Sequence, residues 1–109
     1  MNAPQIGPEQ LAKGLASGEM VGIDVREPEE WEAGRIAGVS WIPFGELGPR
    51  AAELPTDATV VLICRSGARS GYAAEAFHAE GADVANLAGG MTAWVAAGLP
   101  IEPEDGWVL

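Results

Sequence analysis

The chain has 109 residues, of which 48% are hydrophobic and 20% are charged, and this size fits one compact domain over residues 1–109. Sixteen acidic residues against six basic ones give a formal net charge of -10 at pH 7, which repels phosphate backbones and anionic lipid at long range. We therefore expect neither nucleic acid nor a membrane surface as a partner.

The chain contains one cysteine, Cys64, and one histidine, His78. A lone cysteine excludes an intramolecular disulfide, and the lack of clustered cysteines and histidines excludes the common zinc sites. Residues 1–10 lack the basic and apolar regions of a signal peptide, and no long apolar run follows. We expect a cytoplasmic protein with a reduced thiol and no bound metal or cofactor.

Glycines and prolines divide the chain into short segments that alternate between helical and strand-like patterns. We predict four helices, over residues 8–17, from Glu27–Pro28 to Gly34, over about 69–80 and over about 91–97. We predict strands over residues 21–25, 39–42, 59–64 and 83–87. Residues 44–54 are expected to be loosely helical. Strands that alternate with helices favour a mostly parallel α/β sheet.

The strand predicted over residues 59–64 is apolar on both alternating faces, as expected of a central strand with helices on each side. Ligand sites in such sheets lie at the carboxyl ends of strands. Cys64 is the last residue of this predicted strand, so the thiol is expected at the edge where a site would form.

Small and polar residues follow the thiol: Arg65, Ser66, Gly67, Ala68, Arg69 and Ser70. A strand that turns through a glycine into a helix directs successive N–H groups into a concavity, where they bind negative charge. Helix N-termini and neighbouring cations lower the pKa of a thiol. We predict that Cys64 is largely ionised at neutral pH and accessible to solvent.

The two serines and the two arginines of this loop each have two possible roles. Ser66 and Ser70 either cap the following helix or donate their hydroxyls inward. Arg65 and Arg69 are two of the six cations of the chain and either supply positive potential to the thiolate or are solvated surface residues. Four residues separate Cys64 from Arg69, whereas tyrosine and dual-specificity phosphatases need five residues between their cysteine and arginine to wrap a phosphoryl group. The shorter loop therefore suits a smaller group, such as a sulfane sulfur.

Three motifs occur in order: Ile23–Trp31 with Gly34, Ile36 and Gly38 behind it; the loop Cys64–Ser70; and Leu87–Trp94 continuing through Ala97–Pro100. With them the chain resembles the rhodanese-like domains, in particular the small single-domain thiosulfate sulfurtransferases. The match covers about Ile6 to Pro100 and leaves residues 101–109 as a C-terminal tail. The resemblance implies a five-stranded, mostly parallel sheet with helices on both faces, and an active loop whose amides cradle a persulfide.

The resemblance also implies the chemistry. Cys64 would take the outer sulfur of thiosulfate, a small anionic donor, and pass it to cyanide or to a thiol acceptor such as glutathione, a thioredoxin-like protein or a sulfur-carrier protein. Arg65 and Arg69 would supply positive potential, and no cofactor is implied because sulfur itself is carried. Asp24 and Arg26 would flank the site from the neighbouring strand end, or Asp24 would brace the loop by accepting its N–H groups.

Two positions depart from the family pattern: Arg35 stands where histidine is usual, and Trp41 where a small polar residue is common. Trp41 and Trp107 either pack or line a protein-docking surface, whereas Trp31 and Trp94 are predicted to lie in the core. The alternative functions are a non-catalytic sulfur-carrier or binding module of the rhodanese fold and a small Cys-dependent phosphatase or arsenate reductase.

Overall fold

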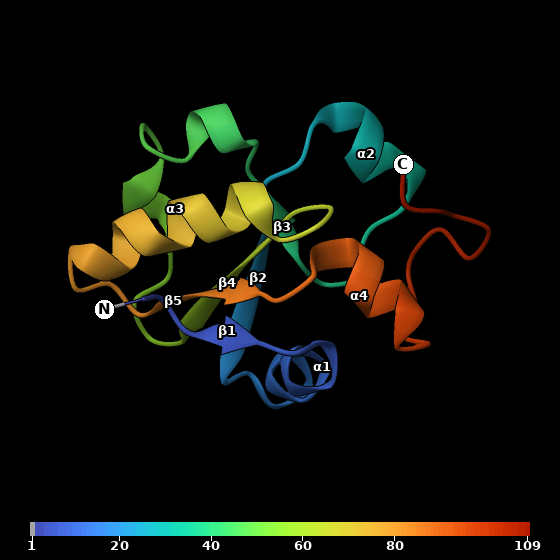
Figure 1. Cartoon of the computed structure of the whole chain (residues 1–109), viewed down its shortest axis with the longest axis horizontal. Helices are drawn as coiled ribbons and strands as arrows, with labels where there is room; N and C mark the ends of the chain where they lie inside the picture. Colours follow the sequence, from blue (N-terminus) through green and yellow to red (C-terminus); the bar gives the residue numbers. More distant parts are fainter. Residues whose placement is uncertain (1) are drawn as a thin grey trace.

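The computed structural model describes residues 2–109 and contains one five-stranded parallel sheet in the order β1-β5-β4-β2-β3 (Figure 1). In chain order the elements are β1 Gln5–Ile6, α1 Pro8–Ser17, β2 Met20–Asp24, α2 Pro28–Ala33, β3 Ser40–Trp41, the 3-10 turns η1 Phe44–Glu46 and η2 Ala51–Glu53, β4 Thr59–Ile63, α3 Ala68–Ala79, β5 Val84–Leu87 and α4 Gly90–Ala96. The predicted α/β class is confirmed.

The central strand β4 separates two apolar layers. Val60 and Leu62 pack in a cluster with Ala73 and Ala74 of α3. The alternate side chains, Val61 and Ile63, pack with Leu11 of α1 and with Met91 and Trp94 of α4. Because side chains alternate across a strand, β4 is apolar on both faces, and helices cover both faces as predicted (Figure 1).

Most predicted elements are present, several with bounds shifted by one residue, and four differences bear on the sheet and the site. The strand β1 was not predicted, because two residues at a sheet edge carry no readable periodicity. Strand β4 ends at Ile63, so Cys64 is the first residue beyond the strand. The segment predicted as loosely helical over residues 44–54 consists of two short 3-10 turns. Strand β3 is confined to Ser40–Trp41.

Of the two tryptophans predicted to lie in the core, only one is fully buried. Trp94 lies in the core, with 3% of its surface exposed. Trp31 is only half-buried, and its ring stacks on Trp41 with centroids 5.9 Å apart. Trp41 also donates from Nε1 to the Arg26 carbonyl at 2.9 Å, so it packs against α2, whereas Trp107 is 59% exposed. None of the helices within residues 2–109 is long and apolar enough to cross a membrane.

Candidate active site

Strand β4 ends between the carboxyl ends of β2 and β5, and the loop after it leads into α3 (Figure 1). Cys64 is the first residue of this loop. The Gly67 amide donates to Cys64 Sγ at 3.1 Å, and the Ser70 hydroxyl lies 3.2 Å from the same sulfur. Gly67 caps α3 with φ 96°, and a Cβ there would lie 3.2 Å from the Gly89 amide nitrogen. The loop therefore directs hydrogen-bond donors at the sulfur, and glycine suits the turn that makes this possible.

Two opposing effects act on the pKa of the Cys64 thiol. Burial, the larger single effect, raises it because the low-dielectric interior disfavours a thiolate. The Ser70 hydroxyl and the amides of Ser70, Gly67 and Ser66 lower it, because each donates to the charged form. The donors together outweigh burial, and the pKa of Cys64 lies below its ordinary value.

The expectation of an accessible thiol is not met, since only 1% of the Cys64 surface is exposed. The reason is its position: Cys64 directly follows the four buried residues 60–63 of β4, and its side chain belongs to the apolar cluster that includes Ala73 and Ala74 of α3. The Gly67 amide and the Ser70 hydroxyl, at 3.1 and 3.2 Å from the sulfur, form part of its surroundings. A reagent therefore reaches the thiol only when neighbouring groups move aside.

Both loop arginines are held by oxygen acceptors. Arg69 binds Glu30 in a bidentate pair, with Nη1 to Oε1 at 2.8 Å and Nη2 to Oε2 at 2.9 Å. This hydrogen bonding from Arg69 holds the pKa of the Glu30 carboxyl below its usual range. The Arg65 Nε donates to the Leu109 carbonyl oxygen at 2.9 Å.

Glu30 was not identified from the sequence as part of the site. It also accepts from the Glu27 amide at 3.0 Å and completes a capping box at the start of α2. A Glu three residues after a helix N-cap is the pattern of that box. The helix start was therefore readable, but the approach of α2 to Arg69 was not.

Asp24 and Arg26 follow the neighbouring strand end as expected, but they face each other. Arg26 donates from Nε and Nη2 to the Asp24 carboxylate at 2.8 to 3.1 Å, and both residues have no exposed surface. Nη2 also donates to the Gly34 carbonyl at 2.7 Å. Within residues 2–109 the structure shows no hydrogen bond between Asp24 and the Cys64–Ser70 loop. The pair thus ties the end of β2 to the turn after α2.

The start of α4 holds the other side of the loop. Its amides donate to the carbonyls of the loop, from Met91 to Cys64 at 2.8 Å and from Thr92 to Arg65 at 3.0 Å. Gly90 makes this approach possible with φ 58°, and a Cβ there would overlap the carbonyl oxygen of Cys64. The motif Leu87–Trp94 was noticed in the sequence, but this contact was not predicted.

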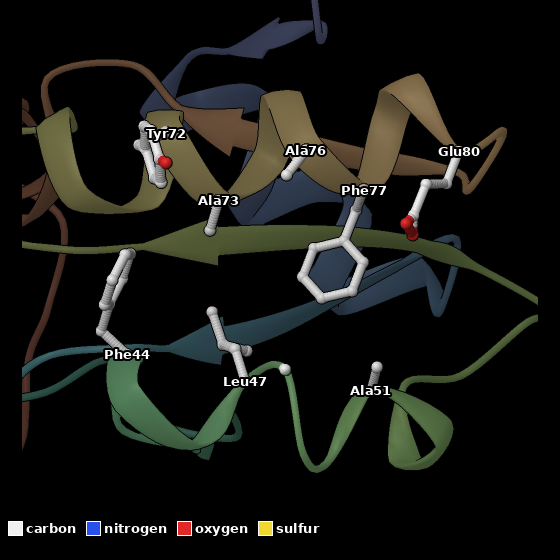
Figure 2. A pocket seen from close by; sticks show the side chains of 9 residues that line it. Phe44, Leu47, Ala51, Tyr72, Ala73, Ala76, Phe77 and Glu80 are labelled. Atoms are coloured by element: carbon white, nitrogen blue, oxygen red, sulfur yellow. The ribbon is translucent and has the colours of Figure 1, made fainter.

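A separate apolar groove of about 410 Å³ runs between α3 and the turns η1 and η2 (Figure 2). Phe44 and Tyr72 stand at one end with ring centroids 6.3 Å apart, and Phe77 and Glu80 lie at the other. No residue of the Cys64–Ser70 loop lines it. Within residues 2–109 no group of His, Cys, Asp or Glu side chains is arranged to hold a metal ion.

Alkylation of Cys64 by iodoacetamide is expected to show a lower pH midpoint than alkylation of an ordinary exposed cysteine thiol, because the thiolate is the reactive form and the pKa of Cys64 is lowered. In Ser70→Ala the midpoint should rise, because burial is then opposed by fewer donors. The rate of mass gain, followed as a function of pH, measures both midpoints. A midpoint in the unmodified chain equal to or above that of a free cysteine in an unstructured peptide would contradict the stabilisation of the thiolate by these donors.

Comparison with known proteins agrees with this geometry. The family model of the rhodanese-like domain matches residues 7–97. A sulfurtransferase of Allochromatium vinosum is 38% identical over 104 residues, which are 94% of this chain and 97% of that protein. A rhodanese-related protein of Thermoplasma volcanium superposes with a TM-score of 0.82 at 31% identity, over 90% of this chain and 96% of that one.

A longer protein contains the same fold. The structure of a thiosulfate sulfurtransferase from Pseudomonas aeruginosa matches with a TM-score of 0.82 and 29% identity, over 94% of this chain but only 20% of that one. The family model, the full-length relative and the parallel sheet with its cysteine loop agree, and the chain belongs to the rhodanese-like domain family.

Proposed function

We propose that the protein is a sulfurtransferase that carries sulfur on Cys64. The Cys64 thiolate attacks the outer sulfur of thiosulfate, the S–S bond of thiosulfate breaks, and sulfite leaves with the bonding electron pair. Cyanide or a thiolate acceptor then attacks the terminal sulfur of the persulfide and releases the Cys64 thiolate. Each half is a nucleophilic displacement at sulfur, so no redox cofactor is needed.

One observation carries this proposal: the donors of the loop converge on the sulfur atom of Cys64. Donors fixed in place before the reaction stabilise the Cys64 thiolate. They also stabilise the negative charge that develops on Sγ, the inner sulfur of the persulfide, when the outer sulfur is transferred to the acceptor. The added sulfur also lengthens the side chain by one S–S bond, about 2 Å, which helps a covered thiol to deliver its cargo. Thiosulfate is the donor we propose, in line with the Pseudomonas relative.

Intact mass spectrometry after incubation with thiosulfate tests the carrier step. The unmodified chain should gain one sulfur atom, and added cyanide should remove it with formation of thiocyanate. Cys64→Ser, which keeps the size of the side chain but not the thiol, should gain nothing. No gain on the unmodified chain, or an equal gain on Cys64→Ser, contradicts the proposal.

The second candidate is a sulfur carrier or binding module without turnover, which the covered thiol and the paired arginines favour. Steady-state production of thiocyanate distinguishes the two: an enzyme turns over many times per chain, whereas a carrier that is loaded only by a partner does not. Phosphatase or arsenate reductase activity is the least supported alternative, and hydrolysis of a chromogenic phosphate ester without any sulfur transfer would select it.

Glu30→Gln is expected to raise the second-order rate with thiosulfate by about threefold to fivefold, since a carboxylate near the site repels a dianion by roughly 1 kcal/mol. Glutamine keeps an acceptor for Arg69 and suits a capping box. The effect should appear in KM more than in kcat, and it should shrink as salt is added.

Glu53→Gln is the matched control for this prediction. Glu53 also forms a bidentate pair with an arginine, Arg50, and the substitution changes the net charge by the same amount. The pair is exposed and lies outside the Cys64 loop, so the rate should stay nearly unchanged. An equal rise in both variants would assign the effect to net charge and contradict a local role of Glu30.

A further inference from the structure

A buried polar side chain behind the thiol has no part in the steps above. Asn86 lies on β5 among Val84, Ala85 and Leu87, and only 4% of its surface is exposed. Its Oδ1 accepts from the Ser70 hydroxyl at 2.5 Å. Its Nδ2 donates to the Gly67 carbonyl at 3.2 Å and to Gln5 Oε1 at 3.0 Å.

These contacts determine which way the Asn86 amide faces. A main-chain carbonyl can only accept, so the atom that faces Gly67 must be the nitrogen of the amide. Oδ1 then faces Ser70, and the Ser70 oxygen lies between two acceptors, Asn86 Oδ1 and Cys64 Sγ.

The Ser70 hydroxyl has one proton for these two acceptors. When Cys64 is a thiol, its S–H can donate to the Ser70 oxygen while Ser70 donates to Asn86, and every polar atom is satisfied. When Cys64 is a thiolate, the sulfur needs the Ser70 proton, and Asn86 Oδ1 is left buried without a donor. A buried acceptor without a partner is costly.

We propose that Asn86 is a positioning residue that competes with the Cys64 thiolate for the Ser70 hydroxyl proton and thereby favours the states in which Sγ is uncharged. The inference rests on the proposed role of Cys64 as the sulfur carrier, because the inner sulfur of a persulfide is one such uncharged state. Asn86 thus disfavours the empty thiolate relative to the loaded persulfide.

The charged side chains around the loop bind elsewhere, and within residues 2–109 none of them forms a hydrogen bond with the side chain of Ser70 or Asn86. Arg69 of α3 interacts with Cys64 and is paired with Glu30 of α2. Arg65 binds the Leu109 carbonyl, and Asp24 and Arg26 after β2 pair with each other. The helix α4 carries no charged side chain, and on β5 the polar residue is Asn86 itself. Exchange of the Ser70 proton is therefore a local event.

Asn86→Leu tests the inference, because it removes the competing acceptor at a similar side-chain size. The Gly67 carbonyl keeps a donor, the Gly71 amide at 3.0 Å, and Gln5 is exposed to water. The pH midpoint for alkylation of Cys64 should fall by about one unit, on the scale of one hydrogen bond to a charged group. A merely structural role would loosen the loop and raise the midpoint, so the direction of the shift decides.

Ser70→Ala with Asn86→Leu provides the second arm. If Asn86 acts through Ser70, the double variant should have the same midpoint as Ser70→Ala alone, and a further fall would overturn the inference. Asn86→Val covers poor folding of the leucine variant: it also lacks an acceptor for the Ser70 proton, its branched side chain suits a strand, and the midpoint should again fall, whereas a rise would contradict the proposal. These measurements use no sulfur donor, so they can contradict the role of Asn86 without contradicting sulfur transfer by Cys64. Likewise, a failure of sulfur transfer from thiosulfate would leave the measured midpoints unchanged.

Discussion

Gly90→Ala is expected to lower the free energy of unfolding by about 3 kcal/mol or more and to remove most sulfur transfer. Part of the cost is the left-handed backbone at φ 58°, which costs a non-glycine residue about 1 to 2 kcal/mol. The rest is overpacking, typically about 1 to 3 kcal/mol. The new Cβ would overlap the Cys64 carbonyl oxygen and lie 2.6 Å from that of Arg65, so the loop must shift.

A shift of the loop has a chemical consequence that a loss of stability alone does not. Met91 and Thr92 donate to the same two carbonyls, so their displacement moves the main chain that directs amides at the sulfur. The alkylation midpoint of the folded variant should therefore rise. Urea unfolding and pH-dependent alkylation measure the two effects separately.

Gly98→Ala is the matched control. Gly98 also has a left-handed backbone, φ 79°, but a Cβ there meets no atom within 4 Å. It should carry the backbone cost of about 1 to 2 kcal/mol and leave the thiol unchanged. If both variants lose the same stability and keep the same midpoint, the close approach of α4 does not shape the loop.

The features that the sequence predicted correctly depend on residues that are close together in the sequence. The apolar run before Cys64 indicated a central strand, and Gly67 indicated the turn into α3. The start of α2 followed from Glu27 and Pro28. Each is a local pattern of period, cap or turn, which the side chains determine over a few residues.

The features that were missed depend on contacts between distant segments. Glu30 and Arg69 are 39 positions apart, and Arg65 and Leu109 are 44 apart. Asn86 stands in a run that reads only as a strand, and its importance comes from Ser70, which the packing of α3 on β5 brings beside it. The covered thiol has the same origin, since the buried residues of its cluster come from segments that are far apart in the chain. No local pattern encodes such proximity.

Arg26→Met is expected to lower the free energy of unfolding by about 3 to 5 kcal/mol, which is the usual cost of leaving a buried charge without its partner. Asp24 would lose its partner in a site with no exposed surface, and the Gly34 carbonyl would lose its donor at 2.7 Å. This is a large fraction of the stability of an ordinary domain, about 5 to 15 kcal/mol. Denaturant unfolding measures it.

Arg50→Met is the control, because Arg50 also binds carboxylates, those of Glu46 and Glu53, but at the surface. Exposed pairs contribute little, so its unfolding midpoint should barely move. If Arg26→Met were equally harmless, the buried pair would contribute nothing to the fold.

Asp24→Ala with Arg26→Met should recover part of the loss, because removing both charges leaves none unpaired. The pair lies at the end of β2, beside the strand that presents Cys64, and its two members face each other. The folded double variant should therefore still take up sulfur from thiosulfate on Cys64. Loss of that uptake in a folded double variant would assign the pair a direct part in the chemistry.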